Sequence, residues 1–487
     1  MQFFPRPLRA TTISSRFARA RAARLFVPTL AFALGSGLAL SCDSSDGPAD
    51  SDPESTAGAG AQVAVGNGGA EANVGGSGGA APTAQGGTGG VAAEAGGAGG
   101  MATAVGGTGG AAPELLGTPA RPQLTPELAE QGNVLRYLAQ AGNLAAGLTV
   151  DDWDPTAGVG DVASFTPGFR VAVSGGTHTT VQAAIDAAVL VGGTARQYIE
   201  VSAGTYREVV CVPSAAPPIT LYGSDPDATH TVIAFDNYSG KPKEVGTPAN
   251  PCNPSLDSAT FGTSGSATFA AYARDFQAKN LSIVNDTDEA TAAGGLQGVA
   301  LMTQGDRLIF ENVRALGNQD TLYVKSPNVG TVARAYLKGC YVEGDTDFIF
   351  GRGTFVLDGC TIHSLTSRTA GGVIVAPSTP SQNPYGILIT NSTFTGDATA
   401  GVSSTHLGRA WDESQTDVAT YAMNVATGAY PNGQALIRQS VLGAHIQSAA
   451  PWRAAATTSR PYSSTAGMYP ANRLFEFENT GPGSAQP

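Results

Sequence analysis

After about residue 165, the chain consists of short apolar runs, rich in β-branched and aromatic residues, that are separated by Gly, Asn, Asp and Ser. Runs of this kind predict short strands joined by turns. One stretch, Thr180 to Leu190, has the spacing of apolar residues that favours a helix. The pattern therefore predicts a mostly β domain in which helices play a minor part.

The runs recur as a unit in which an apolar strand is followed by Asn or Gly and then by a second short strand. Five anchor residues hold the middle position of this unit, at spacings of 32, 27, 20 and 32 residues: Asn280, Asn312, Gly339, Gly359 and Asn391. A constant unit at variable spacing is typical of a solenoid whose turns keep their strands and carry inserted loops. We predict an all-β parallel β-helix with loop insertions, and a β-sandwich is the alternative.

The first 41 residues have a different pattern. Residues 1–24 contain six arginines and no acidic residue, and a mostly apolar run from Leu25 to Leu40 follows. This order predicts a signal peptide for export; a single membrane anchor is the alternative, although the run is short for a span of roughly 20 residues. Residues 38–42 resemble the lipobox of bacterial lipoproteins, which predicts a surface protein anchored through lipidated Cys42. Ordinary cleavage and secretion is the other possibility.

Residues 42–120 are mostly Gly, Ala, Ser and Thr with repeated Gly-Gly pairs. Such a segment buries too little apolar surface to offset its ordering entropy, so we predict a disordered tether. An N-terminal extension over residues 121–164 would follow, then the β domain over 165–480 and a tail over 481–487.

The formal net charge is −12, and it becomes −18 when the six arginines of the predicted signal peptide are removed. An acidic chain is a poor partner for nucleic acid. It would also be repelled by a polyanionic polysaccharide more than by the neutral, methylated form of the same polymer.

Cys340 and Cys360 each follow an anchor of the repeat by one residue. In register they would stack one strand apart, roughly 4.8 Å, which predicts a disulfide between them. Cys211 and Cys252 form a second possible pair, which leaves Cys42 as the odd cysteine. Free buried thiols are the alternative for both pairs.

Two aspartates share a position in the repeat. Asp320 lies eight residues after Asn312, and Asp347 lies eight residues after Gly339. If the register holds, the two carboxylates lie a few ångströms apart on adjacent coils, where one pKa should rise and the other stay low. Such a pair could provide an acid and a nucleophile, whereas the simpler interpretation is that each aspartate caps a turn.

Five stretches in order resemble the motifs of the pectin methylesterase family, in its bacterial branch. They are Gly204–Glu208, Gln297–Leu301, Gly317–Leu322, Gly344–Gly351 and Leu407–Trp411. The resemblance covers about residues 165–480 and implies a right-handed parallel β-helix. It also implies a monomeric enzyme without metal or cofactor that removes methyl groups from methylesterified pectin (homogalacturonan).

The resemblance also assigns roles. Asp347 resembles the nucleophile that forms a covalent acyl-enzyme anhydride, and Asp320 resembles the acid that protonates methanol and then accepts a proton from water. Gln319 and Gln297 would donate hydrogen bonds to the oxyanion, and Arg409 would hold Asp347 ionised. The resemblance further suggests four aromatic residues that contact the substrate: Trp411, Phe348, Phe350 and Tyr323.

Three positions depart from the family pattern: Gly298 replaces the usual alanine, Ala410 the usual proline, and Asn318 an aromatic residue or His. We expect these changes to affect substrate affinity rather than reaction type. Tyr206 and Glu208 lie on an early coil, where a motif can serve packing, and we interpret them as structural.

Other functions have weaker support in the sequence. The five histidines form no spaced pair that indicates a serine triad or a zinc site, and no calcium or phosphate-binding motif is present. A pectate lyase or polygalacturonase would have no use for glutamines beside the aspartates. The remaining alternatives are a relative that acts on other esters or thioesters, and an anchored pectin-binding module.

Overall fold

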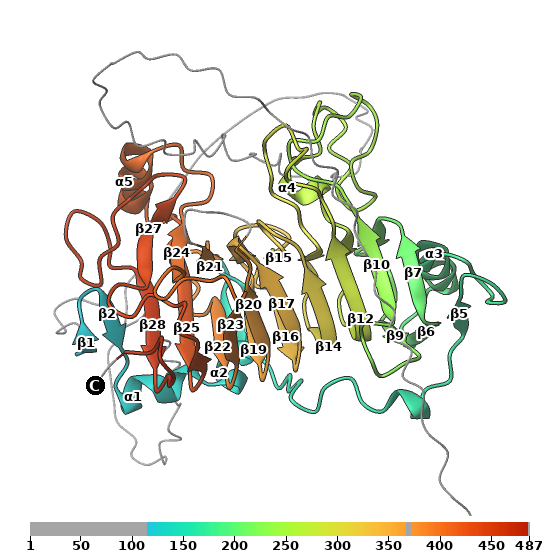
Figure 1. Ribbon diagram of the computed structural model, residues 1–487, viewed down its shortest axis with the longest axis horizontal. Coiled ribbons are helices and arrows are strands. Elements are labelled where there is room, and N and C mark those ends of the chain that lie inside the picture. The colour runs from blue at the N-terminus through green and yellow to red at the C-terminus, as the bar shows by residue number, and fades with distance from the viewer. Residues whose placement is uncertain (1–113, 367–371, 486–487) are drawn as a thin grey trace, which may run out of the picture. The chain divides into compact units, whose positions relative to one another are not determined.

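The computed structural model describes residues 114–366 and 372–485. Nearly all pairings between successive coils are parallel, and neighbouring strands come from successive turns of the chain (Figure 1). The predicted parallel β-helix is therefore confirmed, and the β-sandwich alternative is wrong. The predicted signal peptide, Cys42 and most of the predicted tether lie outside the described residues.

One face of the β-helix is an eight-stranded sheet. Its strands, in order along the β-helix, are β8 (Val210–Val212), β11 (Phe269–Ala271), β13 (Leu301–Thr303), β15 (Leu322–Val324), β18 (Thr346–Gly351), β21 (Val373–Pro377), β24 (His406–Trp411) and β27 (Trp452–Ala456).

The other two faces form one continuous 18-stranded sheet that bends at the corner of each coil. Before the corner lie β5 (Phe169–Val171), β6 (Gln197–Val201), β9 (Ile219–Gly223), β16 (Arg334–Lys338), β19 (Thr354–Asp358), β22 (Ile387–Thr390), β25 (Gln434–Arg438) and β28 (Arg473–Phe477). After it lie β7 (Gly204–Arg207), β10 (Thr231–Phe235), β17 (Tyr341–Gly344), β20 (Thr361–Ser364), β23 (Thr393–Gly396) and β26 (Val441–Leu442). Two long strands, β12 (Gln277–Asn285) and β14 (Leu308–Leu316), span the corner.

The anchors predicted from the sequence are the residues of this corner. All five have a positive φ, between 51° and 63°. Gly and Asn adopt this left-handed conformation most readily, which explains their recurrence. The side-chain amide of Asn312 also donates to Oδ1 of Asn280 at 2.9 Å, so adjacent corners are bonded to each other. Gln439 and Glu478 continue the series with φ of 48° and 49°, and the sequence pattern missed them because neither residue type suggests this conformation.

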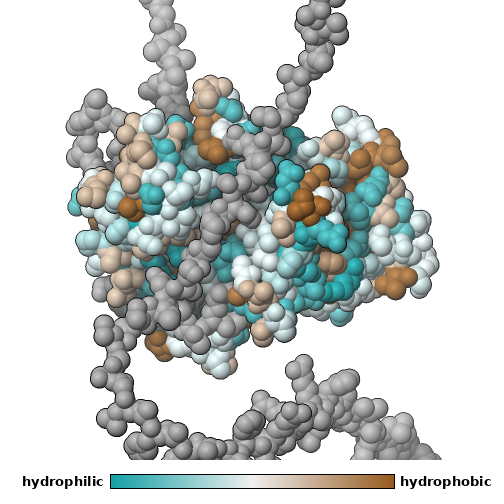
Figure 2. Space-filling view, turned by 90° about the horizontal axis from the view of Figure 1, so that it is seen from above, coloured by the Kyte–Doolittle hydropathy of each residue, from teal (hydrophilic) through white to brown (hydrophobic). Residues whose placement is uncertain are grey.

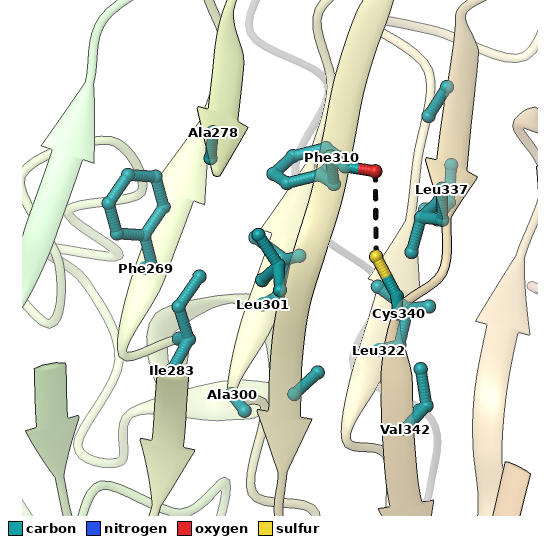
Figure 3. Close-up of a cluster of buried hydrophobic side chains, with 14 of the residues drawn as sticks. Phe269, Ala278, Ile283, Ala300, Leu301, Phe310, Leu322, Leu337, Cys340 and Val342 are labelled. Atoms are coloured by element: carbon teal, nitrogen blue, oxygen red, sulfur yellow. Dashed lines mark hydrogen bonds between the residues drawn. The ribbon is translucent and has the colours of Figure 1, made fainter. Parts of the chain in front are cut away.

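Apolar side chains fill the interior between the faces. Phe276 contacts Phe269 and Phe310 with ring centroids 5.7 and 6.1 Å apart. Aliphatic side chains such as Ile283, Leu301 and Leu322 fill the interior beside them (Figure 3). Each coil buries its inward side chains against the coils before and after it, so no coil is expected to be stable alone.

The predicted disulfide between Cys340 and Cys360 is absent, and both thiols are free and buried. The two residues do stack on adjacent coils, but each thiol makes hydrogen bonds instead. Sγ of Cys360 accepts from the backbone N–H of Cys340 at 3.3 Å, and Sγ of Cys340 lies 3.5 Å from the carbonyl oxygen of Phe310 (Figure 3). The next coils place Ser392 and Ser440 at the same position with equivalent bonds. The cysteines are thus part of a polar ladder along the corner.

The disulfide of the described chain joins Cys211 to Cys252. Cys211 lies in β8, and Cys252 lies in a long insertion that precedes the short helix α4 (Gly262–Gly265). The bond therefore fixes this insertion to the outer surface of the eight-stranded sheet.

The segment before the first coil lies along the outside of the 18-stranded sheet. It contains β1 (Leu116–Thr118), β2 (Arg121–Gln123), α1 (Pro126–Ala129), α2 (Val134–Ala139) and a hairpin of β3 (Gln140–Asn143) and β4 (Gly147–Val150). β2 pairs with the last strand, β28, whereas Phe165 contacts Tyr198 and Tyr222 of the early strands β6 and β9. Residues 114–165, which we call the strap, therefore connect the last coils to the first.

Helix α3 (Val181–Val191) covers the start of the β-helix, close to the predicted Thr180 to Leu190. The side chain of Thr180 caps it, and the Glu208 carboxylate accepts the N–H groups of Val181 and Gln182 at 2.8 and 2.9 Å. A carboxylate at this end of a helix is favourable. The hydroxyl of Tyr206 donates to the carbonyl of Ser202 at 2.9 Å, so the structural interpretation of Tyr206 and Glu208 is confirmed.

On the face shown in Figure 2, hydrophobic residues lie in small separate patches among hydrophilic ones. A second helix of similar length, α5 (Val418–Thr427), lies between β24 and β25 in the chain. Among the described residues, no helix has the length and apolar character needed to cross a membrane.

Candidate active site

Asp320 and Asp347 lie where two adjacent coils enter the eight-stranded sheet. Asp320 precedes β15 by two residues, and Asp347 is the second residue of β18. Both have positive φ, of 67° and 48°, a conformation that Asp tolerates better than most residues. Residues in such rarely populated backbone conformations cluster at functional sites, and here two equivalent positions on adjacent coils adopt one.

The strand register places the two aspartates opposite each other. Leu322 pairs with Ile349, and the same offset of 27 residues separates Asp320 from Asp347. The N–H of Asp320 donates to the carbonyl of Thr346 at 3.1 Å, which ties the two corners together. The predicted location of both aspartates on adjacent coils, one strand spacing of about 4.8 Å apart, agrees with this register.

Arg409 holds the carboxylate of Asp347. Its Nε lies 3.0 and 3.2 Å from the two carboxylate oxygens, and its Nη2 lies 2.6 Å from Oδ2. Arg409 lies on β24, two strands from β18, with β21 between them. The intervening strand presents Ala376, paired with Phe350, and this small side chain lets the arginine reach across. The result is a partly buried ion pair of bidentate geometry, which orients the carboxylate.

The two glutamines lie beside the aspartates on the same corners. The N–H of Gly298, which follows Gln297 in the chain, donates to the carbonyl of Gln319 at 3.0 Å. Gln297 and Gln319 therefore lie on adjacent coils. Gln319 is buried, whereas Gln297 is partly exposed. Among the described residues, the side-chain amide of Gln297 has no hydrogen-bond partner, so a ligand could accept from it.

Gly298 itself has a steric explanation. A Cβ atom at this position would lie 2.9 Å from Oδ1 of Asn285. The nearby Asn318 lines a shallow depression with Gln319, and the other residues of its wall are Asn285, Thr287, Glu289, Leu296 and Gly298. The two departures from the family pattern thus lie in one wall next to the aspartates.

A row of outward-facing side chains crosses the eight-stranded sheet beside this corner. Paired positions on successive strands carry Cys211, Ala270, Met302, Tyr323, Phe350 and Ala376. Tyr323 and Phe350 stack with ring centroids 4.1 Å apart, and the Trp411 ring lies 5.6 Å from that of Phe350. Three of the four predicted substrate-contacting aromatic residues therefore form one cluster on the outer side of the sheet, in which Tyr323 and Phe350 are buried and Trp411 is partly exposed.

Phe348 was predicted to contact the substrate, and this prediction is wrong. Its side chain is fully buried in the interior of the β-helix with that of Ile349. The positive φ of Asp347 interrupts the alternation of inward and outward residues, so both residues after it point inward. Phe350 is then the first outward aromatic residue of β18.

A buried ion pair that the sequence pattern does not predict lies next to this cluster. Asp412, directly after Trp411, accepts from Nε and Nη2 of Arg460 at 3.0 and 2.9 Å, and from the hydroxyl of Thr458 at 2.6 Å. Both charged side chains are essentially inaccessible to solvent. The pair fixes the end of β24, the strand that carries Arg409 and Trp411. Forty-eight residues separate Asp412 from Arg460, and no local pattern links them.

The site thus combines two adjacent carboxylates, a guanidinium bonded to Asp347, side-chain amide donors and an aromatic cluster from which Trp411 is partly exposed. This arrangement can perform nucleophilic and acid–base chemistry on an acyl group. No cluster of His, Cys, Asp or Glu suited to a metal ion occurs within residues 114–366 and 372–485.

Comparison with known proteins links these features to one family. The family model described as "Pectinesterase" matches residues 170–433. A pectinesterase of Ralstonia solanacearum is 48% identical over 372 residues, which is 75% of this chain and 92% of the relative.

Two further relatives cover most of the chain. The solved structure of rice weevil pectin methyl esterase superposes with a TM-score of 0.63 at 31% identity, over 75% of this chain and 98% of that one. A putative acyl-CoA thioester hydrolase, YbhC of Escherichia coli, is 31% identical over 409 residues, or 76% of this chain and 90% of the relative.

Proposed function

The chain belongs to the pectinesterase family and is an esterase, and from this we propose that it hydrolyses the methyl esters of polygalacturonate through a covalent aspartyl intermediate. The observation that carries the mechanistic part of the proposal is the pair of aspartates at equivalent corners of adjacent coils, together with the bidentate contact of the Arg409 guanidinium with the Asp347 carboxylate. The guanidinium orients the carboxylate of Asp347, which suits this residue to act as the nucleophile.

In the first half of the reaction, a carboxylate oxygen of Asp347 attacks the ester carbonyl carbon. The carbonyl electrons move to oxygen, and the tetrahedral oxyanion accepts hydrogen bonds from the amides of Gln297 and Gln319. Removing one such donor typically costs about 3 to 4 kcal/mol in transition-state stabilisation. The C–O bond to the methoxy group then breaks, Asp320 gives its proton to the leaving oxygen, and methanol departs from an acyl-enzyme anhydride.

In the second half, water replaces methanol. Asp320, now ionised, accepts a proton from the water as its oxygen attacks the galacturonate carbon of the anhydride. The bond from that carbon to the Asp347 oxygen breaks, which restores the Asp347 carboxylate and leaves a galacturonate carboxyl group. Asp320 is protonated again, so one residue serves both halves of the cycle. The partly exposed ring of Trp411, packed against the buried rings of Tyr323 and Phe350, would support a sugar ring beside these groups.

We also propose that the protein works outside the cytoplasm, either secreted or attached to the surface through Cys42. The predicted signal peptide supports export, and the disulfide between Cys211 and Cys252 fits an oxidising compartment. The proposed partner is methylesterified pectin, bound by a monomer.

The name of the Escherichia coli relative motivates a second candidate, hydrolysis of a thioester. The same aspartate could attack a thioester carbonyl, with a thiol as the leaving group. The two candidates differ in the substrate and share the site.

One experiment tests both. The exported protein without its signal peptide is incubated in chelator with highly methylated pectin and, separately, with an acyl-CoA, and methanol and thiol release are measured. We expect methanol release that falls at least about a thousandfold in Asp347→Asn and Asp320→Asn. Absence of methanol from the parent would refute the pectinesterase activity. Full activity in Asp347→Asn would refute only the covalent mechanism.

A further inference from the structure

The outward row of the eight-stranded sheet continues past the aspartates and ends in two arginines. Arg409 on β24 pairs in register with Arg453 on β27. Trp452, the residue before Arg453, is buried in the interior core, so Arg453 points outward from the sheet, and it is exposed. The two guanidinium groups therefore start from neighbouring strands, about 4.8 Å apart, on the surface that carries the proposed active site.

The two arginines differ in what they bind. Arg409 is bonded to Asp347, and the two carboxylates that directly follow Trp411 in the chain are each paired with another arginine, Asp412 with Arg460 and Glu413 with Arg352. In contrast, no carboxylate among the described residues lies within ion-pair distance of Arg453, and its guanidinium makes no hydrogen bond to them. An unneutralised cation thus lies beside the site of an otherwise acidic protein.

The neighbouring His406 does not add a second positive charge beside Arg453. His406 on β24 is the titratable neighbour, and burial, together with Arg453 and Arg409, lowers its pKa to about 4. His406 is therefore neutral at neutral pH.

We propose that Arg453 binds the free carboxylate of a de-esterified galacturonate unit while another unit of the same chain presents its methyl ester to Asp347. A guanidinium forms charge-assisted bonds with a carboxylate and has no such interaction with a neutral methyl ester. This inference rests on the proposed function, since it assumes that the substrate is a polymer of uronic acid units.

The position of Arg453 determines which unit it contacts. β27 lies three strands from β18, or about 14 Å along the row. That separation is too large for Arg453 and Asp347 to contact one carboxyl group. The enzyme would therefore act fastest on a methyl ester that has an already hydrolysed unit on the β27 side, and hydrolysis would extend existing de-esterified blocks.

The test compares substrates as well as variants. The specificity constant for methanol release is measured on fully methylated and on half-methylated polygalacturonate, for the parent, Arg453→Gln and Arg453→Lys. Because an exposed ion pair contributes modestly, we expect Arg453→Gln to reduce the preference for the half-methylated polymer about fivefold. Arg453→Lys should retain most of the preference, and high salt should weaken the preference of the parent.

Arg136→Gln serves as the matched control, because Arg136 is an exposed arginine on α2 of the strap. It should keep the preference of the parent. An unchanged preference in Arg453→Gln would overturn the proposal, and so would an equal change in Arg136→Gln.

A binding measurement keeps this test independent of the proposed reaction. Calorimetry with fully de-esterified oligogalacturonate should show weaker binding to Arg453→Gln than to the parent and Arg136→Gln. Equal affinities of all three proteins would overturn the role of Arg453 even if methanol release is robust. If the parent releases no methanol but still binds oligogalacturonate more tightly than Arg453→Gln does, the proposed function is overturned. The binding of uronate by Arg453 would then still stand.

Discussion

At the scale of single residues, the contact between Arg409 and Asp347 depends on the shape of the guanidinium group. Two of its nitrogens bond the same carboxylate, which a lysine cannot reproduce with one ammonium group. We predict that Arg409→Lys lowers kcat about 10- to 100-fold and changes KM less, because the nucleophile is displaced while the aromatic surface remains.

Steady-state methanol release on methylated pectin measures this effect. The control is Arg352→Lys, whose ion pair with Glu413 is equally shielded but does not involve Asp347. A kcat of Arg409→Lys within twofold of the parent would contradict the orienting role.

His445 gives a prediction for pH dependence. Its ring is buried, its Nε2 has no hydrogen-bond partner among the described residues, and burial lowers its pKa to about 4. In the unfolded chain the pKa of His is near 6.5, so the unfolded state binds the proton first. The stabilising contribution of neutral His445 is thus complete above pH 6.5 and is lost as the pH falls toward 4, by up to about 3 kcal/mol.

Urea unfolding at pH 7, 6 and 5 checks this prediction. His445→Gln should show a smaller decrease of unfolding free energy over this range than the parent. His230→Gln, which removes an exposed ring whose pKa is raised by its bond to Asp225, should not show this smaller decrease. Parallel curves for the parent and His445→Gln would show that the buried ring does not control acid stability.

At the scale of elements, β24 depends on the buried ion pair that follows it. Breaking such a pair by removing one charge typically costs about 3 to 5 kcal/mol. We predict that Asp412→Asn destabilises the protein and also raises KM severalfold, because the strand end that positions Trp411 and Arg409 loses its fixed partner, Arg460.

The chain offers a matched control in the buried pair of Arg121 and Glu476, which joins β2 to β28. Glu476→Gln should lose a similar free energy of unfolding and keep the KM of the parent at a temperature where both variants are folded. If the two variants have the same KM, Asp412 has only a structural role.

The strands and corners of the β-helix differ in how well they could be predicted from the sequence. The corners were predictable because left-handed backbone selects Gly and Asn, whereas Gln439 and Glu478 adopt the same φ without a signal in the residue type. Equal offsets from the corners located Asp320 and Asp347. The predictions for Phe348 and for a disulfide between Cys340 and Cys360 were wrong although the predicted strand spacing was correct. The backbone direction after Asp347 turns Phe348 inward, and the two thiols make hydrogen bonds instead of a disulfide.

At the scale of the whole molecule, the strap contacts both early and late coils. It covers an outward apolar row that includes Ile309, Tyr336 and Val356, and it contributes Tyr137, Leu138 and Trp153 to the contact. The sequence predicted only an extension of unspecified structure here, since the partners are hundreds of residues away. A solenoid whose coils contact only their neighbours gains cooperativity from such a long-range connection.

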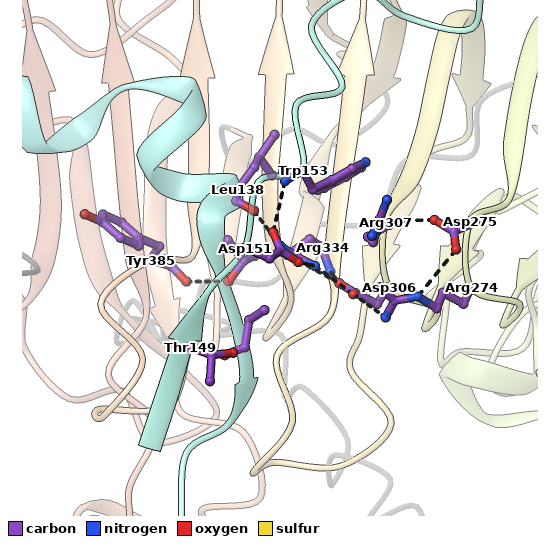
Figure 4. A network of polar contacts seen from close by, with 12 residues as sticks. Leu138, Thr149, Asp151, Trp153, Arg274, Asp275, Asp306, Arg307, Arg334 and Tyr385 are labelled. Carbon is purple, nitrogen blue, oxygen red and sulfur yellow. Dashed lines mark hydrogen bonds and ion pairs between the residues drawn. The ribbon is translucent and has the colours of Figure 1, made fainter. Parts of the chain in front are cut away.

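Arg334 fastens the middle of the strap. Its guanidinium is fully buried and bonds Asp306 of the β-helix and Asp151 of the strap, as well as the carbonyl of Leu138 (Figure 4). We predict that Arg334→Met lowers the unfolding free energy by about 3 to 5 kcal/mol, because two carboxylates lose their shared partner. Arg170→Met, which removes an exposed pair with Glu200, should cost less than about 1 kcal/mol.

Limited proteolysis adds the decisive readout: if the strap is held at Arg334, cleavage within residues 139–165 should accelerate in Arg334→Met under conditions where the coils remain folded. Equal cleavage rates in the two variants would mean that the apolar contacts alone hold the strap in place.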